Sequence, residues 1–220
     1  MKPSILSFSF ASAFAFACGS AYAAPAPGND GASYAAARQQ FISGSAGDAS
    51  ARDASIDAFE KLAGSQPGNP VYLAYQGAGI AMRGRDASMP WEKMKFAEKG
   101  ADMVEKAVSL LAPEHDTLLV NGEPASIVTR MVAANTLLAL PDFMHRRAMG
   151  KRALQGALDS QALAQAPAPL RASVFSAAAR VAAEEKRGAD EIGYLRQVVA
   201  TQAATPPVAK AAARLKELGQ

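Results

Sequence analysis

Residues 67–113 read PGNPVYLAYQGAGIAMRGRDASMPWEKMKFAEKGADMVEKAVSLLAP, and this stretch decides the fold. Pro70 suits the first turn of a helix, where its missing N–H would have no partner in any case. Small residues then recur at the spacing of one helix face, at Ala74, Gly77, Ala78 and Ala81. Such a face lets another backbone approach closely, so we expect this helix to be clamped between two others.

A polar break, 83–86, separates this helix from a second one. We expect Gly84 to end the first helix and Ser88 to cap the second, which has Pro90 in its first turn. The second helix is expected to end before Pro113, because proline and the residue before it disfavour the helical conformation. Its apolar side carries Ala101, Val104, Ala107, Val108 and Leu111. The stretch therefore predicts an antiparallel helix pair.

The residues around Pro67 carry a known repeat spacing. Upstream, Ser55, Phe59, Leu62 and Pro67 follow the pattern small-x3-Phe-x2-apolar-x4-Pro, and downstream Leu73, Gly77 and Ile80 occupy the next expected positions. This spacing resembles a tetratricopeptide repeat across one repeat junction. The chain departs from that family in that Pro67 and Pro113 lie 46 positions apart, whereas the repeat is about 34 residues long.

The segment MPWEKMKFAEKG, 89–100, also resembles exported bacterial tetratricopeptide-like proteins of unassigned function. The resemblance covers about a third of the chain and carries no catalytic residues. It implies a tetratricopeptide-like fold with a concave groove. The extra residues, centred on 83–93, are expected to extend the turn or its helices, because additional residues in a repeat usually form a loop.

Similar apolar stripes continue along the rest of the chain. Beside the central pair, helices are expected at 33–42, 48–63, 124–140, 142–158, 170–186, 191–203 and 206–218. An Ala/Pro/Gln-rich linker is expected at 161–169. The sequence thus predicts an all-α chain of about nine helices in antiparallel pairs, arranged as an α-solenoid or a closed helical array. Residues 32–220 are expected to form this single helical domain.

The amino-terminal residues have the features of an export signal. Lys2 supplies a positive charge, 5–17 is an apolar run too short to span a membrane, and Ala21-Tyr22-Ala23 matches a signal-peptidase site. We therefore expect a signal peptide at 1–23, a flexible leader at 24–31 and a periplasmic mature protein without a transmembrane segment. Cys18 leaves a second possibility open, in which it is lipidated and anchors a lipoprotein. If it is removed with the signal peptide, no cysteine remains for disulfides or thiolate chemistry.

Two basic patches are candidate partner-binding sites. One consists of Arg83, Arg85, Trp91 and Lys95 around the extended turn, and the other contains Arg146 and Arg147. Arginine donors suit carboxylates and phosphates, and tryptophan beside arginine is typical of an interface anchor. The alternatives are solvated helix faces for the arginines and a core position for Trp91. The net charge of +3 is too balanced to indicate a nucleic-acid partner.

No group of residues in the sequence indicates catalysis or metal binding. Glu114-His115-Asp116 places two carboxylates beside an imidazole, but the second of the two histidines is far away in sequence, at position 145. A metal site needs three or four converging ligands, so we expect His115 to serve in a turn or cap. No catalytic residue, metal or cofactor is predicted.

The sequence therefore favours a non-enzymatic periplasmic module that binds a protein or peptide partner in its groove, as an accessory of an envelope export or transport system. The alternative is a binder of a small apolar ligand or lipid between helices. That alternative rests on the methionines, which line adaptable pockets but are more often core residues: Met82, Met89, Met94, Met103, Met131, Met144 and Met149.

Overall fold

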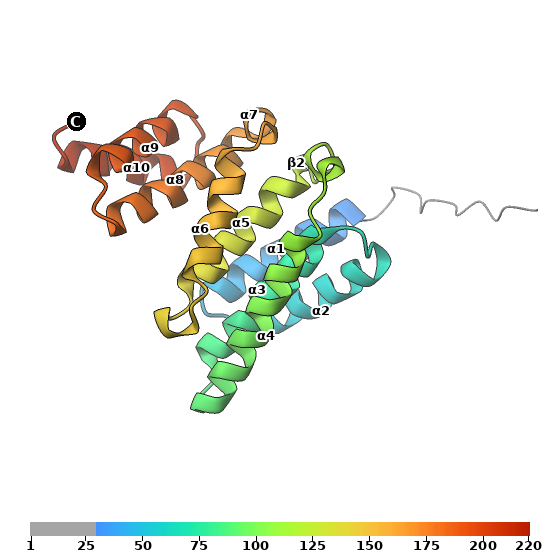
Figure 1. Ribbon diagram of the computed structural model, residues 1–220. Helices are drawn as coiled ribbons and strands as arrows, with labels where there is room; N and C mark the ends of the chain where they lie inside the picture. Colours follow the sequence, from blue (N-terminus) through green and yellow to red (C-terminus); the bar gives the residue numbers. More distant parts are fainter. Residues whose placement is uncertain (1–29) are drawn as a thin grey trace, which may run out of the picture.

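The computed structural model describes residues 30–220, and within this range the chain is an all-α helical array with one minimal hairpin (Figure 1). The expected signal peptide, Cys18 and most of the expected leader lie outside the described residues. The elements follow in chain order: α1 Asp30–Ser45, α2 Ala49–Ser65, α3 Pro70–Asp86, α4 Pro90–Ser109, a 3-10 helix Pro113–Asp116, β1 Leu119–Val120, β2 Glu123–Pro124, α5 Ala125–Ala139, a 3-10 helix Asp142–Met144, α6 Arg147–Leu158, α7 Ala162–Gln165, α8 Ala168–Glu184, α9 Gly188–Ala200 and α10 Pro206–Glu217.

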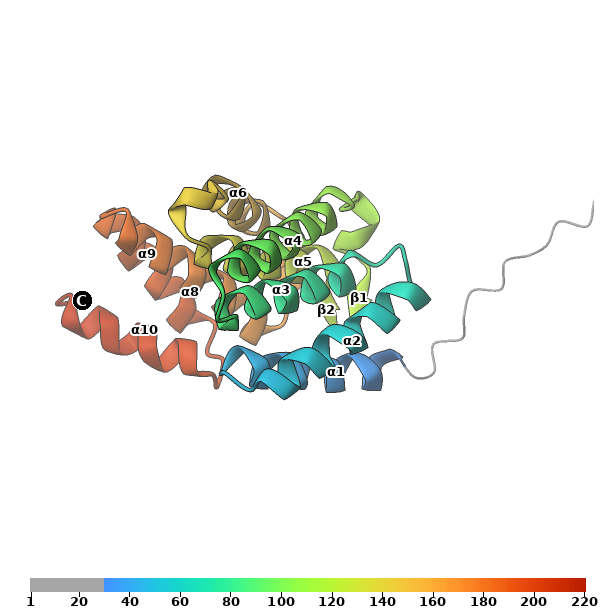
Figure 2. The same ribbon diagram turned by 90° about the horizontal axis from the view of Figure 1, so that it is seen from below.

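The helices are arranged as successive antiparallel pairs. α1 packs on α2, α3 on α4, α5 on α6 and α8 on α9, and α10 adds to the last pair. The pairs stack because α2 also packs on α3, and α5 lies against both α3 and α4. Figure 2 shows this progression from α1 and α2 at one end to α9 and α10 at the other. The prediction of an all-α array of paired helices is confirmed.

Small residues allow close packing of the central pair, α3 and α4. A Cβ at Gly77 would come within 2.9 Å of the carbonyl oxygen of Gly100 on α4, while a Cβ at Gly79 would meet the Ile56 side chain of α2 at 2.6 Å. α3 is therefore clamped between α2 and α4, as expected, although Gly79 lies outside the predicted small-residue face. The expected helix end at Gly84 is wrong. α3 continues to Asp86, and a Cβ at Gly84 would lie only 2.8 Å from the backbone nitrogen of Ala97 on α4.

Several other boundaries differ from those predicted. Met89, not Ser88, occupies the cap position of α4. The helix expected over 142–158 is interrupted at His145, which has a φ of 56°, so that α6 begins only at Arg147. The expected linker contains the short helix α7 and the first two residues of α8. The first helix begins at Asp30, so the last two residues of the expected leader are helical.

The hairpin is the element that the sequence prediction missed. Asn121 and Gly122 both have positive φ, and they join β1 to β2 with Val120 paired to Glu123. Asn-Gly is the preferred pair for such a two-residue turn. Each strand has only two residues, which is too short to produce the alternating pattern by which strands are recognised.

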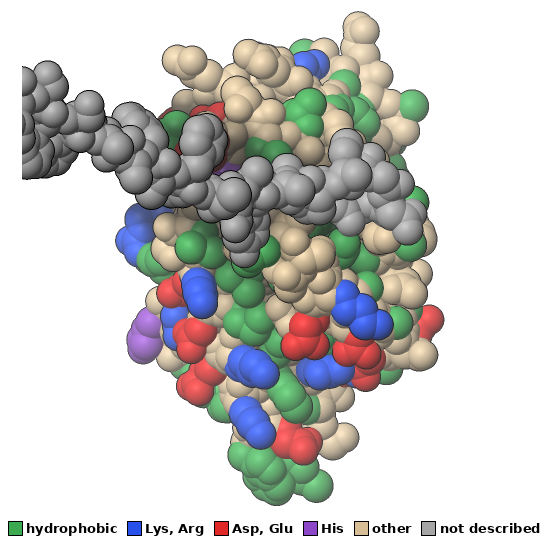
Figure 3. Space-filling model, turned by 90° about the vertical axis from the view of Figure 1, so that its right-hand side faces the viewer, with side chains coloured by type: hydrophobic (Ala, Val, Ile, Leu, Met, Phe, Trp, Pro, Cys, Tyr) green, Lys and Arg blue, Asp and Glu red, His purple; other side chains and the backbone are tan. Residues whose placement is uncertain are grey.

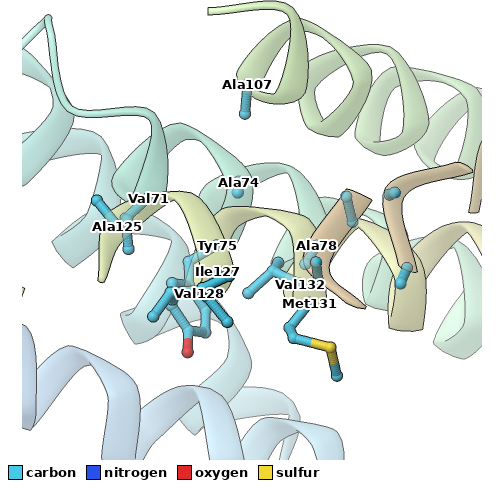
Figure 4. Close-up of a cluster of buried hydrophobic side chains, with 14 of the residues drawn as sticks. Val71, Ala74, Tyr75, Ala78, Ala107, Ala125, Ile127, Val128, Met131 and Val132 are labelled. Carbon is cyan, nitrogen blue, oxygen red and sulfur yellow. The ribbon is translucent and has the colours of Figure 1, made fainter. Parts of the chain in front are cut away.

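The main core runs from α1 to α8 and begins with an aromatic cluster. The ring of Phe59 stacks on that of Tyr75 at 4.7 Å, and Tyr34 meets both rings edge-on at about 6 Å. This cluster joins α1, α2 and α3. In the next layer, Ile127 and Val132 of α5 are buried with Ala74 and Ala78 of α3 (Figure 4). A smaller apolar cluster, which includes Leu195 and Val198, joins α8, α9 and α10.

Candidate functional site

A hollow of about 510 Å³ opens among the first helices of the four pairs, α1, α3, α5 and α8. This volume lies in the range of small-molecule and side-chain pockets. We call it the inner hollow. Its apolar lining includes Phe41, Tyr75, Met82, Val128, Met131 and Leu170.

One stripe of each helix faces this space. α1 contributes Arg38, Phe41, Ile42 and Ser45, which have the i, i+3, i+4, i+7 spacing of a single face. α5 repeats the pattern with Val128, Met131, Val132, Asn135 and Thr136. Figure 4 shows Tyr75, Val128 and Met131 pointing to the same side, away from Ala107 of α4. The inner hollow is therefore made by the inward faces of helices that are distant in sequence.

The lining also contains a charged pair, of which one partner is buried and the other half-buried. Arg38 Nη1 of α1 lies 3.4 Å from Glu123 Oε2, which β2 carries into the wall of the hollow. Glu123 is only 8% exposed, whereas the Arg38 side chain is 35% exposed. Glu123 Oε2 is closed to solvent and has no hydrogen-bond partner. The Arg38–Glu123 pair therefore has unused hydrogen-bonding capacity in the wall of a mostly apolar hollow.

Burial sets the electrostatics of this group. Desolvation raises the pKa of Glu123, and the nearby Arg38 guanidinium offsets only part of that effect. Burial also raises the pKa of Tyr75 and of Tyr34, so both phenols stay protonated. The cluster thus combines a desolvated carboxyl group, a guanidinium and a phenol that face one cavity.

The six predicted partner-binding residues do not form one site. Arg83 donates to Asp53 of α2 at 2.8 Å, and Arg85 pairs with Asp86 and also donates to the carbonyl groups of Gly44 and Ser45. Of the six, only Arg85 lines the inner hollow. These contacts connect the end of α3 to α1 and α2. Both arginines therefore have a structural role.

Trp91 and Lys95 lie on the outside of the array. Trp91 is 68% exposed, so the alternative that it is a core residue is wrong. Together with Met94, Lys99 and Met103 these residues border a shallow depression along α4, which we call the α4 patch. Figure 3 shows hydrophobic side chains gathered at the lower tip of the molecule, below a face of mixed charges.

Arg146 and Arg147 are held by carboxylates from other helices. Arg146 donates to Glu105 at 2.7 Å and to Asp102 at 2.9 Å, both on α4. Arg147 pairs with Glu184 of α8. The hydrogen bond that Arg146 donates to Glu105 raises the pKa of Arg146. This basic patch therefore connects α6 to its neighbours, and its charges are matched within the fold.

The methionines do not form a continuous seam. Met82 and Met131 line the inner hollow, while Met94 and Met103 border the α4 patch. Met89 is 47% exposed near the start of α4. Met144 and Met149 belong to neither surface.

His115 has the turn role that the sequence predicted. Its Nδ1 accepts the backbone N–H of Ala112 at 2.9 Å, and its Nε2 lies 3.1 Å from the carbonyl oxygen of Gly68, to which it donates in this tautomer. The buried ring thereby links the 3-10 helix to the turn before α3. Among residues 30–220, no three His, Cys, Asp or Glu side chains are grouped as a metal site would require. No helix in the same range has the length and hydrophobicity needed to cross a bilayer.

The residues that the sequence argument missed are Arg38, Tyr75 and Glu123. Arg38 follows Tyr34 by one helical turn, which could have indicated that both belong to the inward face of α1. The Asn121-Gly122 pair could have indicated the hairpin that positions Glu123. Their convergence, by contrast, depends on how three separate elements pack.

Comparisons with known proteins identify no relative: no family model matches the chain, and no curated protein or solved structure matches it.

Proposed function

We propose that this chain is a non-enzymatic periplasmic module of tetratricopeptide-like fold, which binds a protein or peptide segment in its inner hollow. The observation that carries the proposal is that the first helices of four successive pairs line one cavity. Stacked helix pairs produce such a groove by geometry, and grooves of this kind bind apolar side chains of partner segments. The export signal expected at 1–23 supports a role beside an envelope export or transport system.

The lining supports a peptide side chain as occupant. Its surface is mostly apolar, and its polar groups are few and converge near Arg38 and Glu123. An apolar pocket with a small number of placed polar groups is the usual form of a recognition site. Of the six residues predicted from the sequence, Arg85 lines the hollow, and Trp91 and Lys95 lie on the outer α4 patch.

A peptide selection tests this proposal. Random peptides displayed on phage are selected on the wild-type chain, on Thr136→Trp and on Ala148→Trp. Thr136 faces the inner hollow, so tryptophan there fills it, whereas Ala148 is an exposed residue of α6 outside the hollow. We expect the wild type and Ala148→Trp to enrich the same apolar peptides and Thr136→Trp to lose them. Equal enrichment by all three chains would show that the hollow is not the binding site.

A second candidate is supported by the volume alone. A cavity of about 510 Å³ can also hold a small apolar ligand or lipid chain between helices. Native mass spectrometry of the freshly purified chain separates the two cases. The peptide proposal expects the mass of the bare chain, whereas a constant added mass that is lost in Thr136→Trp would favour the ligand.

A further inference from the structure

The charged pair in the wall of the inner hollow points to a specific chemical group on the occupant. Resting on the function proposed above, we propose that Arg38 and Glu123 form a subsite for a neutral amide, which is held beside the apolar side chain that fills the hollow. The guanidinium would donate to the amide oxygen, and the carboxylate of Glu123 would accept the amide N–H. The amide is a main-chain peptide group of the bound segment.

The first argument is unused hydrogen-bonding capacity. Glu123 Oε2 makes no hydrogen bond although Glu123 is 8% exposed, and its separation from Arg38 Nη1 is 3.4 Å, longer than a charge-assisted hydrogen bond. A buried carboxylate with incomplete pairing costs free energy, and an occupant that donates to it would offset part of that cost. Oε2 itself is closed to solvent, but the Glu123 side chain keeps 10% of its surface exposed and lines the hollow together with Arg38, so an occupant meets Glu123 through that exposed part.

The second argument is charge balance. A carboxylate bound to Arg38 would lie beside the Glu123 carboxylate, and an ammonium group bound to Glu123 would lie beside the Arg38 guanidinium. Like charges at such short separation repel strongly in a site that is partly shielded from water. An amide carries a donor and an acceptor without net charge, so it can satisfy both residues and meets no repulsion.

The other cationic group at the hollow does not change this balance. Arg85 is already engaged by Asp86 and by the carbonyl groups of Gly44 and Ser45. The remaining polar lining residues, which include Asn135, Thr136 and Ser173, are uncharged. The charge that an occupant meets near Glu123 is therefore set by the Arg38–Glu123 pair.

Three probes with the same leucine side chain test the subsite: N-acetyl-leucine amide is neutral, N-acetyl-leucine is an anion and leucine amide is a cation. Binding is followed through the ¹³C-methyl signals of Met82 and Met131, which line the hollow. On the wild-type chain we expect the neutral probe to bind with a Kd lower by roughly fivefold or more than that of either charged probe.

Charge variants then predict a reversal. Glu123→Gln removes the carboxylate and leaves Arg38, so the anionic probe should become the tightest binder. Arg38→Met leaves the carboxylate, so the cationic probe should gain instead. Glu60→Gln and Lys210→Met make the same charge changes at exposed positions of α2 and α10 and should leave the wild-type order intact.

The outcomes separate this subsite from the wider function. The amide subsite is overturned if the three probes bind with equal affinity, or if the order of their affinities is the same in both variants as in the wild type. In either case, methyl shifts would still support the hollow as a binding site. Absence of any shift also overturns the subsite. In that case the peptide selection on Thr136→Trp tests separately whether the hollow binds peptides at all.

Discussion

Gly77 and Gly100 bring the backbones of α3 and α4 into direct contact. A Cβ built on Gly100 would lie 2.6 Å from the carbonyl oxygen of Gly77 and 2.5 Å from the backbone nitrogen of Ala81. Neither group can move without displacing a helix. The close approach fixes α3, whose opposite flank carries Tyr75 and Ala78 into the inner hollow.

Gly100→Ala should therefore destabilise the fold. We expect a loss of about 2–3 kcal/mol in the free energy of unfolding, because the methyl group forces the two helices apart. Gly193→Ala is the matched control, since nothing lies within 4 Å of its Cβ position on α9. There the substitution should stabilise the fold by about 0.5–1 kcal/mol. Chemical denaturation measures both values, and equal effects would refute the close contact.

Trp91→Ala should leave the stability within about 0.5 kcal/mol of the wild type, as expected for an exposed surface position. Trp91 is 68% exposed, so little apolar area leaves water at this site on folding. It is also the only tryptophan in the chain, so fluorescence reports on it alone. The native emission should be close to that of the unfolded chain. A strongly blue-shifted native emission, with a large drop in Tm for the variant, would place this ring in the core.

Arg52→Met should lower the free energy of unfolding by about 1–3 kcal/mol, because Arg52, which is 8% exposed, then no longer joins α2 to the end of α3. Arg52 donates to Asp53 at 2.8 Å and to Asp86 at 2.5 Å. Lys61→Met, an exposed change on the same helix, is the control and should be near neutral. Thermal and urea unfolding of the three chains at pH 7 give the comparison.

The same network predicts an acid dependence. The hydrogen bond from Arg52 lowers the pKa of Asp53, and those from Arg85 and then Arg52 lower that of Asp86. A depressed folded-state pKa gives stability that is present above the ordinary carboxyl pKa of about 3.8 and is lost as the pH falls through the folded value. Below pH 4 the wild type should thus lose more stability than Arg52→Met. Parallel pH profiles would contradict the network.

Glu123→Gln should stabilise the unliganded chain at neutral pH, because the amide resembles the neutral carboxyl group, which burial favours over the carboxylate at this position. Burial raises the folded-state pKa of Glu123, so the folded chain binds the proton more tightly than the unfolded chain. The wild type should therefore lose stability relative to the variant as the pH rises above about 4.5, the ordinary pKa of the carboxyl group. Unfolding from pH 4 to pH 8 tests this, with Glu60→Gln as the control. A variant that is less stable than the wild type at pH 8 would contradict it.

The sequence predicted the local features that depend on neighbours along the chain. Pro70 does begin α3, and the small face with Gly77 does meet another backbone. Gly84 misled the prediction because a helix interior can hold glycine where a neighbour, here Ala97, leaves no room for a side chain. The all-α class of the fold and the pairing of consecutive helices follow from the spacing of apolar residues, which is why both could be predicted.

The candidate site could be predicted only in outline. Basic residues were selected because they cluster in sequence, but the carboxylates that engage Arg83, Arg146 and Arg147 come from other helices. Conversely, Arg38 and Glu123 are single charged residues with no local signal, and 85 positions separate them. Only the packing of α1 against the hairpin brings them together. A groove was expected from the repeat resemblance, but its chemistry required the structure.

The most direct test of the central claim is the ¹³C-methyl spectrum of the methionines during titration with a peptide selected on the wild-type chain. Met82 and Met131 report on the inner hollow, and Met94 and Met103 report on the α4 patch. We predict that the signals of Met82 and Met131 shift with a saturable dependence on peptide, while those of Met94 and Met103 stay in place. Shifts confined to Met94 and Met103 would contradict the account and place the binding site beside Trp91.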